Sequence, residues 1–127
     1  MVTYTGTDSK NNITSLWFNP DFVWLKNRTI GTSNALFDSI RWWNKMLRSD
    51  DTSWESSTAW WNDELHSFNS NGFTLNNGNT QQNIHTNRSW YDYVAWNWKA
   101  GWAAVTNTDW SITSQVSANV DAGFSIV

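Results

Sequence analysis

Hydrophobic and polar residues alternate along several short stretches of this chain, and the clearest stretch runs from Tyr91 to Gly101. Its residues divide between the two sides of a strand with period two: Val94, Trp96 and Trp98 on one side, and Tyr93, Ala95, Asn97 and Lys99 on the other. Aromatic and β-branched residues suit such a half-buried, pleated surface. Because two indoles on one face need a deep partner layer, we expect this strand to lie centrally in a packed sheet.

Other stretches have the composition of strands as well, at residues 2–5, 13–18, 22–28, 35–40, 64–68, 73–75 and 123–127. The run from Phe22 to Leu25 is apolar on both sides, which is typical of a strand buried on both faces. The turn from Asn69 to Gly72 predicts a tight hairpin with positive φ at Asn71 and Gly72. Many short strands separated by turn signals predict a single domain, residues 1–127, with an all-β, antiparallel sandwich fold.

One stretch carries a helix signal. Thr52 and Glu55 match a capping box, in which the threonine caps the first turn and the glutamate reaches back. Trp54, Trp61 and Leu65 would then share a face, so we expect at most one short helix within residues 52–62. Residues 36–47 also fit a helical face, but no start signal precedes them, and we favour a strand followed by a turn.

Composition narrows the classes of function. Charged residues make up 15% of the chain and the net charge is -3, without the basic face of a general nucleic-acid binder. The absence of cysteine excludes disulfides, thiolate metal sites and thiol nucleophiles. No apolar run approaches the ~20 residues of a membrane span, and no signal peptide is visible after Met1. Twelve tryptophans are more than such a core needs, which indicates stacking surfaces, an interface or an unusually aromatic core.

Four stretches in order carry a family resemblance: Phe18 to Arg28, Leu36 to Arg41, Ser67 to Leu75 and Tyr93 to Gly101. Through them the chain resembles a domain of marine bacteriophage tail-fibre, tail-spike and structural proteins, which often occurs in tandem and is similar to SPRY and concanavalin-like sandwiches. The resemblance implies a jelly-roll or concanavalin-like β-sandwich on a virion and supplies no catalytic residue. It also implies that three tryptophans are core positions: Trp24, Trp96 and Trp98.

The chain departs from this family's pattern in its added tryptophans. Where relatives tend to carry a glycine after Arg41, this chain has Trp42 and Trp43, and the other additions are Trp54, Trp60, Trp61 and Trp90. We predict that these six indoles stack on sugar rings while polar neighbours bind the hydroxyls. A subunit interface, where tryptophan is also enriched, is the alternative with nearly equal support. Neighbours on a strand point to opposite faces, so one tryptophan of each adjacent pair should be at the surface or in a contact.

Four charged residues lie at the ends of two predicted strands: Lys26, Arg28, Asp38 and Arg41. We favour an ion-pair network that fixes loops, and the alternative is a binding cleft for an acidic saccharide. In tandem relatives, a run like Gly123 to Val127 leads directly into one like Val2 to Gly6. The two ends could then pair within one chain or between neighbouring chains, and only the second arrangement would give a homo-oligomer.

The remaining carboxylates and histidines do not match a catalytic or metal site. Asp50-Asp51 and Asp63-Glu64 are adjacent pairs, whereas a glycosidase holds its two carboxylates on opposite sides of a bond, ~5–10 Å apart. No loop has regular calcium-ligand spacing. His66 and His85 belong to no metal or nucleophile motif. We therefore predict no catalytic residue, no metal and no cofactor.

The sequence as a whole predicts a non-enzymatic carbohydrate- or receptor-binding module of a phage-like virion structural protein. It would act on the virion or outside the cell, and its partner would be a host-surface glycan or another neutral polar ligand. The alternative is a self-assembling module whose tryptophans form the subunit interface and whose terminal strands exchange between chains. Neither hypothesis includes nucleic-acid binding or membrane insertion.

Overall fold

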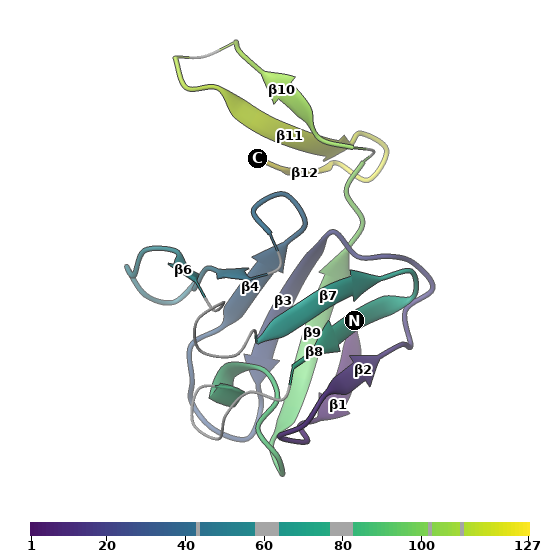
Figure 1. Ribbon diagram of the computed structural model, residues 1–127, viewed down its shortest axis with the longest axis vertical. Helices are drawn as coiled ribbons and strands as arrows, with labels where there is room; N and C mark the ends of the chain where they lie inside the picture. Colours follow the sequence, from purple (N-terminus) through teal and green to yellow (C-terminus); the bar gives the residue numbers. More distant parts are fainter. Residues whose placement is uncertain (43, 58–63, 77–82, 102, 110) are drawn as a thin grey trace.

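A computed structural model of the protein describes residues 1–42, 44–57, 64–76, 83–101, 103–109 and 111–127. The fold is all-β, and each pair of strands is antiparallel (Figure 1). The main sheet has the order β1 (Val2–Thr5), β9 (Asp92–Trp98), β3 (Phe22–Asn27), β4 (Ala35–Asp38). The facing sheet has the order β2 (Asn11–Ile13), β8 (Gly72–Leu75), β7 (Leu65–Asn69). These two layers form the predicted antiparallel sandwich.

The remaining elements adjoin the two layers. A short hairpin consists of β5 (Lys45–Met46) and β6 (Ser56–Ser57). A 3-10 turn, η1 (Asn83–His85), precedes β9. The third sheet has the order β10 (Val105–Asn107), β11 (Ser114–Asn119), β12 (Phe124–Ile126).

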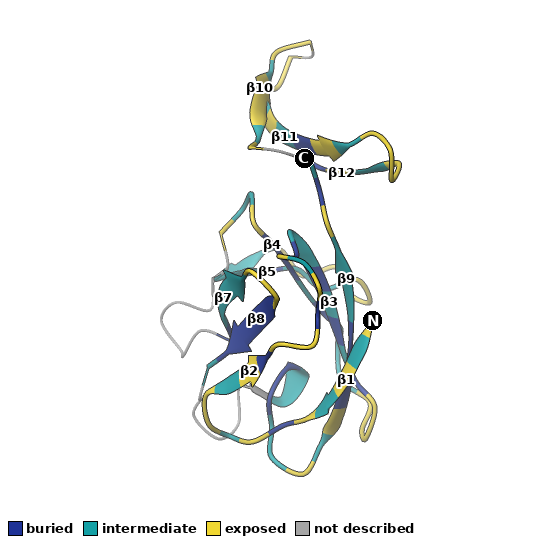
Figure 2. Ribbon diagram, turned by 90° about the vertical axis from the view of Figure 1, so that its right-hand side faces the viewer, coloured by how far each residue is buried: buried dark blue, intermediate teal, exposed yellow. Residues whose placement is uncertain are grey.

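The core fills the space between the two layers of the sandwich (Figure 2). Val23, Leu25 and Phe37 of the main sheet have no exposed surface, and neither do Phe73 and Leu75 of β8. Burying a side chain of this size contributes about 1.5–3 kcal/mol. This core covers one face of the main sheet, and part of the opposite, outer face of that sheet is free to carry a site.

Strand β9 lies between β1 and β3, so the prediction of a central strand is confirmed. Its core-facing residues are Tyr93 and Ala95, which are fully buried. Trp96 and Trp98 instead project from the outer face together with Trp24 of β3, and all three are only half-buried. The prediction that these tryptophans are core positions is therefore wrong. Trp24 and Trp96 are partners across the two strands, and their rings meet edge to face at 5.9 Å.

The hairpin between β7 and β8 forms where it was predicted, with a different loop. Its two loop residues are Ser70 and Asn71, and Asn71 does not take positive φ. Gly72 is the first residue of β8 and is required for close approach of another strand. A Cβ atom at Gly72 would lie 1.8 Å from the carbonyl oxygen of Ile13 in β2.

No helix forms in the described part of residues 52–62, so the capping-box prediction is wrong there. The backbone N–H of Ser53 donates to the Asp51 carboxylate at 2.8 Å. Glu55 forms an ion pair with Lys45 on the opposite strand of the hairpin, at 3.1 Å. The pairing of β5 with β6 thus replaces the helical hydrogen bonds.

The C-terminal sheet stands apart from the sandwich (Figures 1 and 2). It contacts the outer face of the main sheet through Phe124, whose ring centroid lies 6.0 Å from that of Phe22 and 6.1 Å from that of Trp98. Gly101 allows the chain to pass close to β11, because a Cβ there would lie 1.7 Å from the carbonyl oxygen of Ala118. One end of the outer face is therefore covered by the third sheet.

The two terminal strands belong to different sheets. β1 pairs with β9, and β12 pairs with β11. Of the two expected arrangements, pairing of the ends within one chain is not found among the described residues. Exchange between chains stays a prediction.

Candidate functional site

The added tryptophans do not gather on one surface in the described part of the chain. Trp42, Trp54 and Trp90 are 70%, 89% and 89% exposed. Trp42 follows β4 at one end of the main sheet, and Trp90 precedes β9 at the other end. Six strand steps of ~3.3 Å separate these ends by about 20 Å. Trp54 lies in the β5–β6 loop, and the other three lie outside the described residues: Trp43, Trp60 and Trp61.

Two of these tryptophans occupy backbone positions that suit glycine. Trp42 has φ +83° and Trp90 has φ +68°, in the left-handed region that side chains other than glycine disfavour. Such residues cost on the order of 1–3 kcal/mol each. At Trp42 this conformation agrees with the glycine that the resembling domains tend to carry after Arg41.

The four charged candidates separate into two places. Asp38 is fully buried and forms an ion pair with Arg41, whose Nε donates to it at 2.6 Å. The same carboxylate accepts the backbone N–H of Ile40 at 2.9 Å, so this pair fixes a turn. Lys26 and Arg28 lie about 13 Å or more along β3 from Asp38, which is beside Phe22. They border a groove on the outer face of the main sheet.

The floor of this groove is built by three neighbouring strands. Thr3 of β1, Val94 of β9 and Lys26 of β3 form one row across the sheet. Trp96 follows Val94 on the same face, because side chains of a strand alternate. The half-buried Trp96 thus lies in the row next to that of Thr3 and Lys26, and all three residues line the groove. The groove has a volume of about 820 Å³, within the range of small-ligand sites.

The wall of the groove is the loop that follows β3. The Asn27 side chain accepts the backbone N–H groups of Thr29 at 2.9 Å and Ile30 at 3.1 Å, a turn for which asparagine is well suited. Lys26 Nζ donates to the carbonyl oxygen of Thr32 at 2.7 Å. Since these bonds hold the loop over the sheet, the groove is formed without a ligand.

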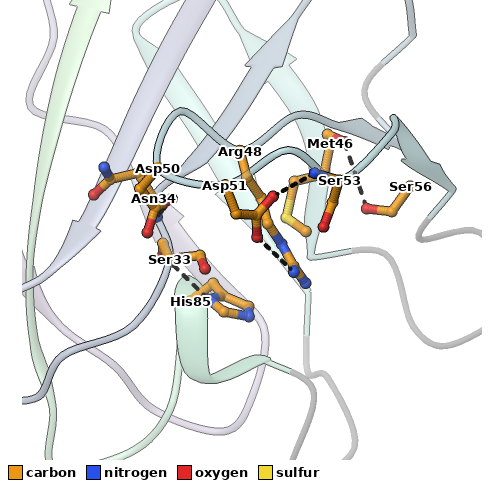
Figure 3. A network of polar contacts seen from close by, with 9 residues as sticks. All are labelled: Ser33, Asn34, Met46, Arg48, Asp50, Asp51, Ser53, Ser56 and His85. Atoms are coloured by element: carbon orange, nitrogen blue, oxygen red, sulfur yellow. Dashed lines mark hydrogen bonds and ion pairs between the residues drawn. The ribbon is translucent and has the colours of Figure 1, made fainter.

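The far end of the same loop is tied to the β5–β6 hairpin and to η1 (Figure 3). The backbone N–H of Asn34 donates to Asp50 at 3.1 Å, and His85 Nδ1 donates to the carbonyl oxygen of Ser33 at 3.1 Å. Burial lowers the pKa of His85, so it is neutral at neutral pH. Asp51 accepts the N–H of Ser53 and pairs with Arg48 at 3.3 Å. These groups anchor loops.

Of the second adjacent carboxylate pair, Glu64 is buried beside the core. Glu64 is 6% exposed, and burial raises its pKa to about 8 against a smaller, opposite effect of Arg48. At neutral pH it is therefore a neutral carboxylic acid beside the core, and Asp63 lies outside the described residues. The described residues contain no group of three or more potential metal ligands.

A second hollow of about 950 Å³ lies between the sandwich and the C-terminal sheet. Two of its charged groups already bind one another, since Lys99 pairs with Asp21 at 3.0 Å, and Asp21 also accepts the N–H of Ala100 at 3.0 Å. Asn119 Nδ2 donates to the carbonyl oxygen of Lys99 at 3.2 Å. No described aromatic side chain lines this hollow. The groove on the outer face is consequently the stronger candidate.

Sequence reasoning found Lys26 and Arg28 but missed Trp96 and Thr3 as members of a site. The usable signal was the run from Phe22 to Leu25, whose two apolar sides show that the sheet has a second apolar face. Nothing local to Thr3 reveals its neighbour Val94, because the two strands are far apart in the chain.

The whole chain, residues 1–127, matches the family model described as "Domain of unknown function (DUF7483)", and the protein belongs to this family. No curated protein and no solved structure matches the chain. In the part of the chain that the structure describes, no helix is long and apolar enough to cross a membrane.

Proposed function

We propose that this protein is a non-enzymatic carbohydrate-binding module and that its binding site is the groove on the outer face of the main sheet. The observation that carries the proposal is the half-buried Trp96 on the floor of a preformed groove. A flat, amphipathic indole offers a stacking surface for the C–H face of a sugar ring. Thr3, Lys26 and Arg28 supply hydrogen-bonding groups at its border.

The geometry favours binding without catalysis. None of the described side chains that line the groove is a carboxylate, imidazole or thiol. Without a carboxylate or an imidazole in its described lining, the groove offers aromatic, hydroxyl and cationic groups that suit binding. By its family resemblance, we place the module on a phage-like virion, with a host-surface glycan as its partner.

The test uses an array of immobilised oligosaccharides and calorimetry with any sugar that binds. We expect Trp96→Ala to weaken binding at least tenfold, about 1.4 kcal/mol. Gly31→Phe should also weaken binding, because Gly31 lines the groove and a Cβ atom there would meet no other atom within 4 Å, which leaves room for a bulky side chain that competes with the ligand. Trp54→Ala, which removes an indole that is 89% exposed and outside the groove, is the matched control. If Trp54→Ala abolishes binding and Trp96→Ala does not, the groove is not the binding site.

A second candidate function is self-assembly through sheet edges. Among the described residues, β1 pairs only with β9, and β12 pairs only with β11. Edge strands with an unpaired side are templates for pairing with another chain. Light scattering across a concentration series tests this, since exchange predicts a mass above the monomer's 14.7 kDa. A constant monomer mass would exclude it.

A further inference from the structure

We infer that the groove takes saccharides that carry a negative charge, with a carboxylate or sulfate group bound by Lys26 and Arg28 while the ring stacks on Trp96. This inference rests on the proposed function and names its ligand class. It starts from an imbalance: the protein has a net charge of -3, yet the groove is bordered by two cations and by no described carboxylate.

The two cations of the groove differ from most others in the protein. Four of the eight cationic side chains form ion pairs within the described residues: Arg41, Lys45, Arg48 and Lys99. Lys26 and Arg28 form none there. Lys26 Nζ donates to a neutral carbonyl oxygen, that of Thr32, which leaves two N–H donors of the ammonium group. An anionic ligand would supply the missing counter-charge.

The carboxylate nearest in register does not supply this counter-charge to Arg28. Asp92 lies at the start of β9, and its backbone oxygen accepts the N–H of Arg28 at 2.7 Å. Its carboxylate accepts the Thr5 hydroxyl at 2.8 Å, and Asp92 forms no ion pair with Arg28 among the described residues. The guanidinium of Arg28 is therefore available at the exposed rim of the groove.

The placement of the two cations suits one anionic group beside a stacked ring. Lys26 and Arg28 are two residues apart where β3 ends, so both extend toward the outer face that carries Trp96. Guanidinium binds carboxylate or sulfate through two parallel N–H donors, and ammonium acts as a point charge beside it. Hydrogen bonds to charged groups are stronger than neutral ones, so the anion would decide selectivity.

The experiment is calorimetry with three tetrasaccharides built on galactose-type rings: a neutral galactan, a galacturonan and a sulfated carrageenan fragment, together with inorganic sulfate. We expect the anionic sugars to bind at least tenfold more tightly than the neutral one, and rising salt to reduce this preference. Arg28→Gln should remove the preference. Lys10→Gln makes the same change of charge at an exposed lysine outside the groove and should leave the preference unchanged.

Each result has a distinct meaning. Equal affinity for neutral and anionic sugars, with no effect of Arg28→Gln but loss in Trp96→Ala, would overturn this inference and leave the proposed function standing. Inorganic sulfate bound as tightly as the sulfated sugar, with no effect of Trp96→Ala, would overturn the proposed function and the ring-stacking part of the inference. No binding of any of the four probes would overturn both.

Discussion

Glu64→Gln should remove a pH dependence of stability that the buried acid imposes. Glu64 is 6% exposed, and its Oε2 has no hydrogen-bond partner among the described residues. Burial raises its pKa from 4.5 to about 8. The folded state therefore holds the proton more tightly than the unfolded chain, so unfolding releases a proton between these pH values. Raising the pH consequently favours the unfolded state.

The magnitude follows from this difference in proton affinity. Each pH unit is worth about 1.4 kcal/mol, so the complete effect is on the order of 5 kcal/mol between pH 4.5 and 8. Burial lowers the pKa of His85, so this residue makes the free energy of unfolding rise with pH, which is opposite to the effect of Glu64. The contribution of His85 is confined to pH values below its ordinary pKa of 6.5. Between pH 6.5 and 8 Glu64 should dominate, and the free energy of unfolding should fall by roughly 2 kcal/mol.

Urea unfolding followed by tryptophan fluorescence measures this fall in the free energy of unfolding directly. The measurement is made at steps of half a pH unit from pH 6.5 to 9. An uncharged glutamine side chain has nearly the shape of the protonated acid, so the stability of Glu64→Gln should be flat over this range and higher than that of the wild type at pH 8. Glu55→Gln, at a half-exposed ion pair, is the matched control and should keep the wild-type slope. An equal slope in Glu64→Gln would show that the titration of Glu64 does not cause the pH dependence.

Two further predictions concern backbone conformation and are checked by the same unfolding assay. Trp42→Gly should raise the free energy of unfolding by about 1 kcal/mol, because it relieves φ +83°. The control Trp54→Gly removes an indole that is also exposed but has no positive φ, so it should not stabilise the protein. Stabilisation by both substitutions or by neither would contradict this prediction. Gly72→Ala should lower the free energy of unfolding by about 3 kcal/mol or more, because the added Cβ would meet the carbonyl oxygen of Ile13. Gly31→Ala should leave the free energy of unfolding nearly unchanged. Equal effects of the two substitutions would argue against the close approach of β2 and β8.

Alternation along the chain was sufficient to predict most of the sandwich and the central position of β9. It could not decide which side of β9 faces the core, because a period of two is the same for both sides. The facing sheet decides this. Phe73 and Leu75 project from β8 into the core, and the small Ala95 leaves them room that Trp96 would fill.

The groove was predictable only in part. Lys26 and Arg28 stand out as charges at a strand end, but a groove also requires Thr3 beside Val94, a contact made by the pairing of the first strand with the ninth. The strand Ser114–Asn119 was missed because its side chains are small and mostly polar. Trp42, Trp54 and Trp90 lie in turns and loops outside the groove.

The most direct test of the central claim is an amide and indole NMR titration of the protein with the oligosaccharide that binds most tightly on the array. We expect the indole N–H of Trp96, assigned through Trp96→Phe, and the backbone amides of residues 28–31 to shift together and to saturate at one ligand per chain. The indole signals of Trp42, Trp54 and Trp90 should stay in place. Shifts confined to those three indoles, with Trp96 unmoved, would show that the groove is not the binding site.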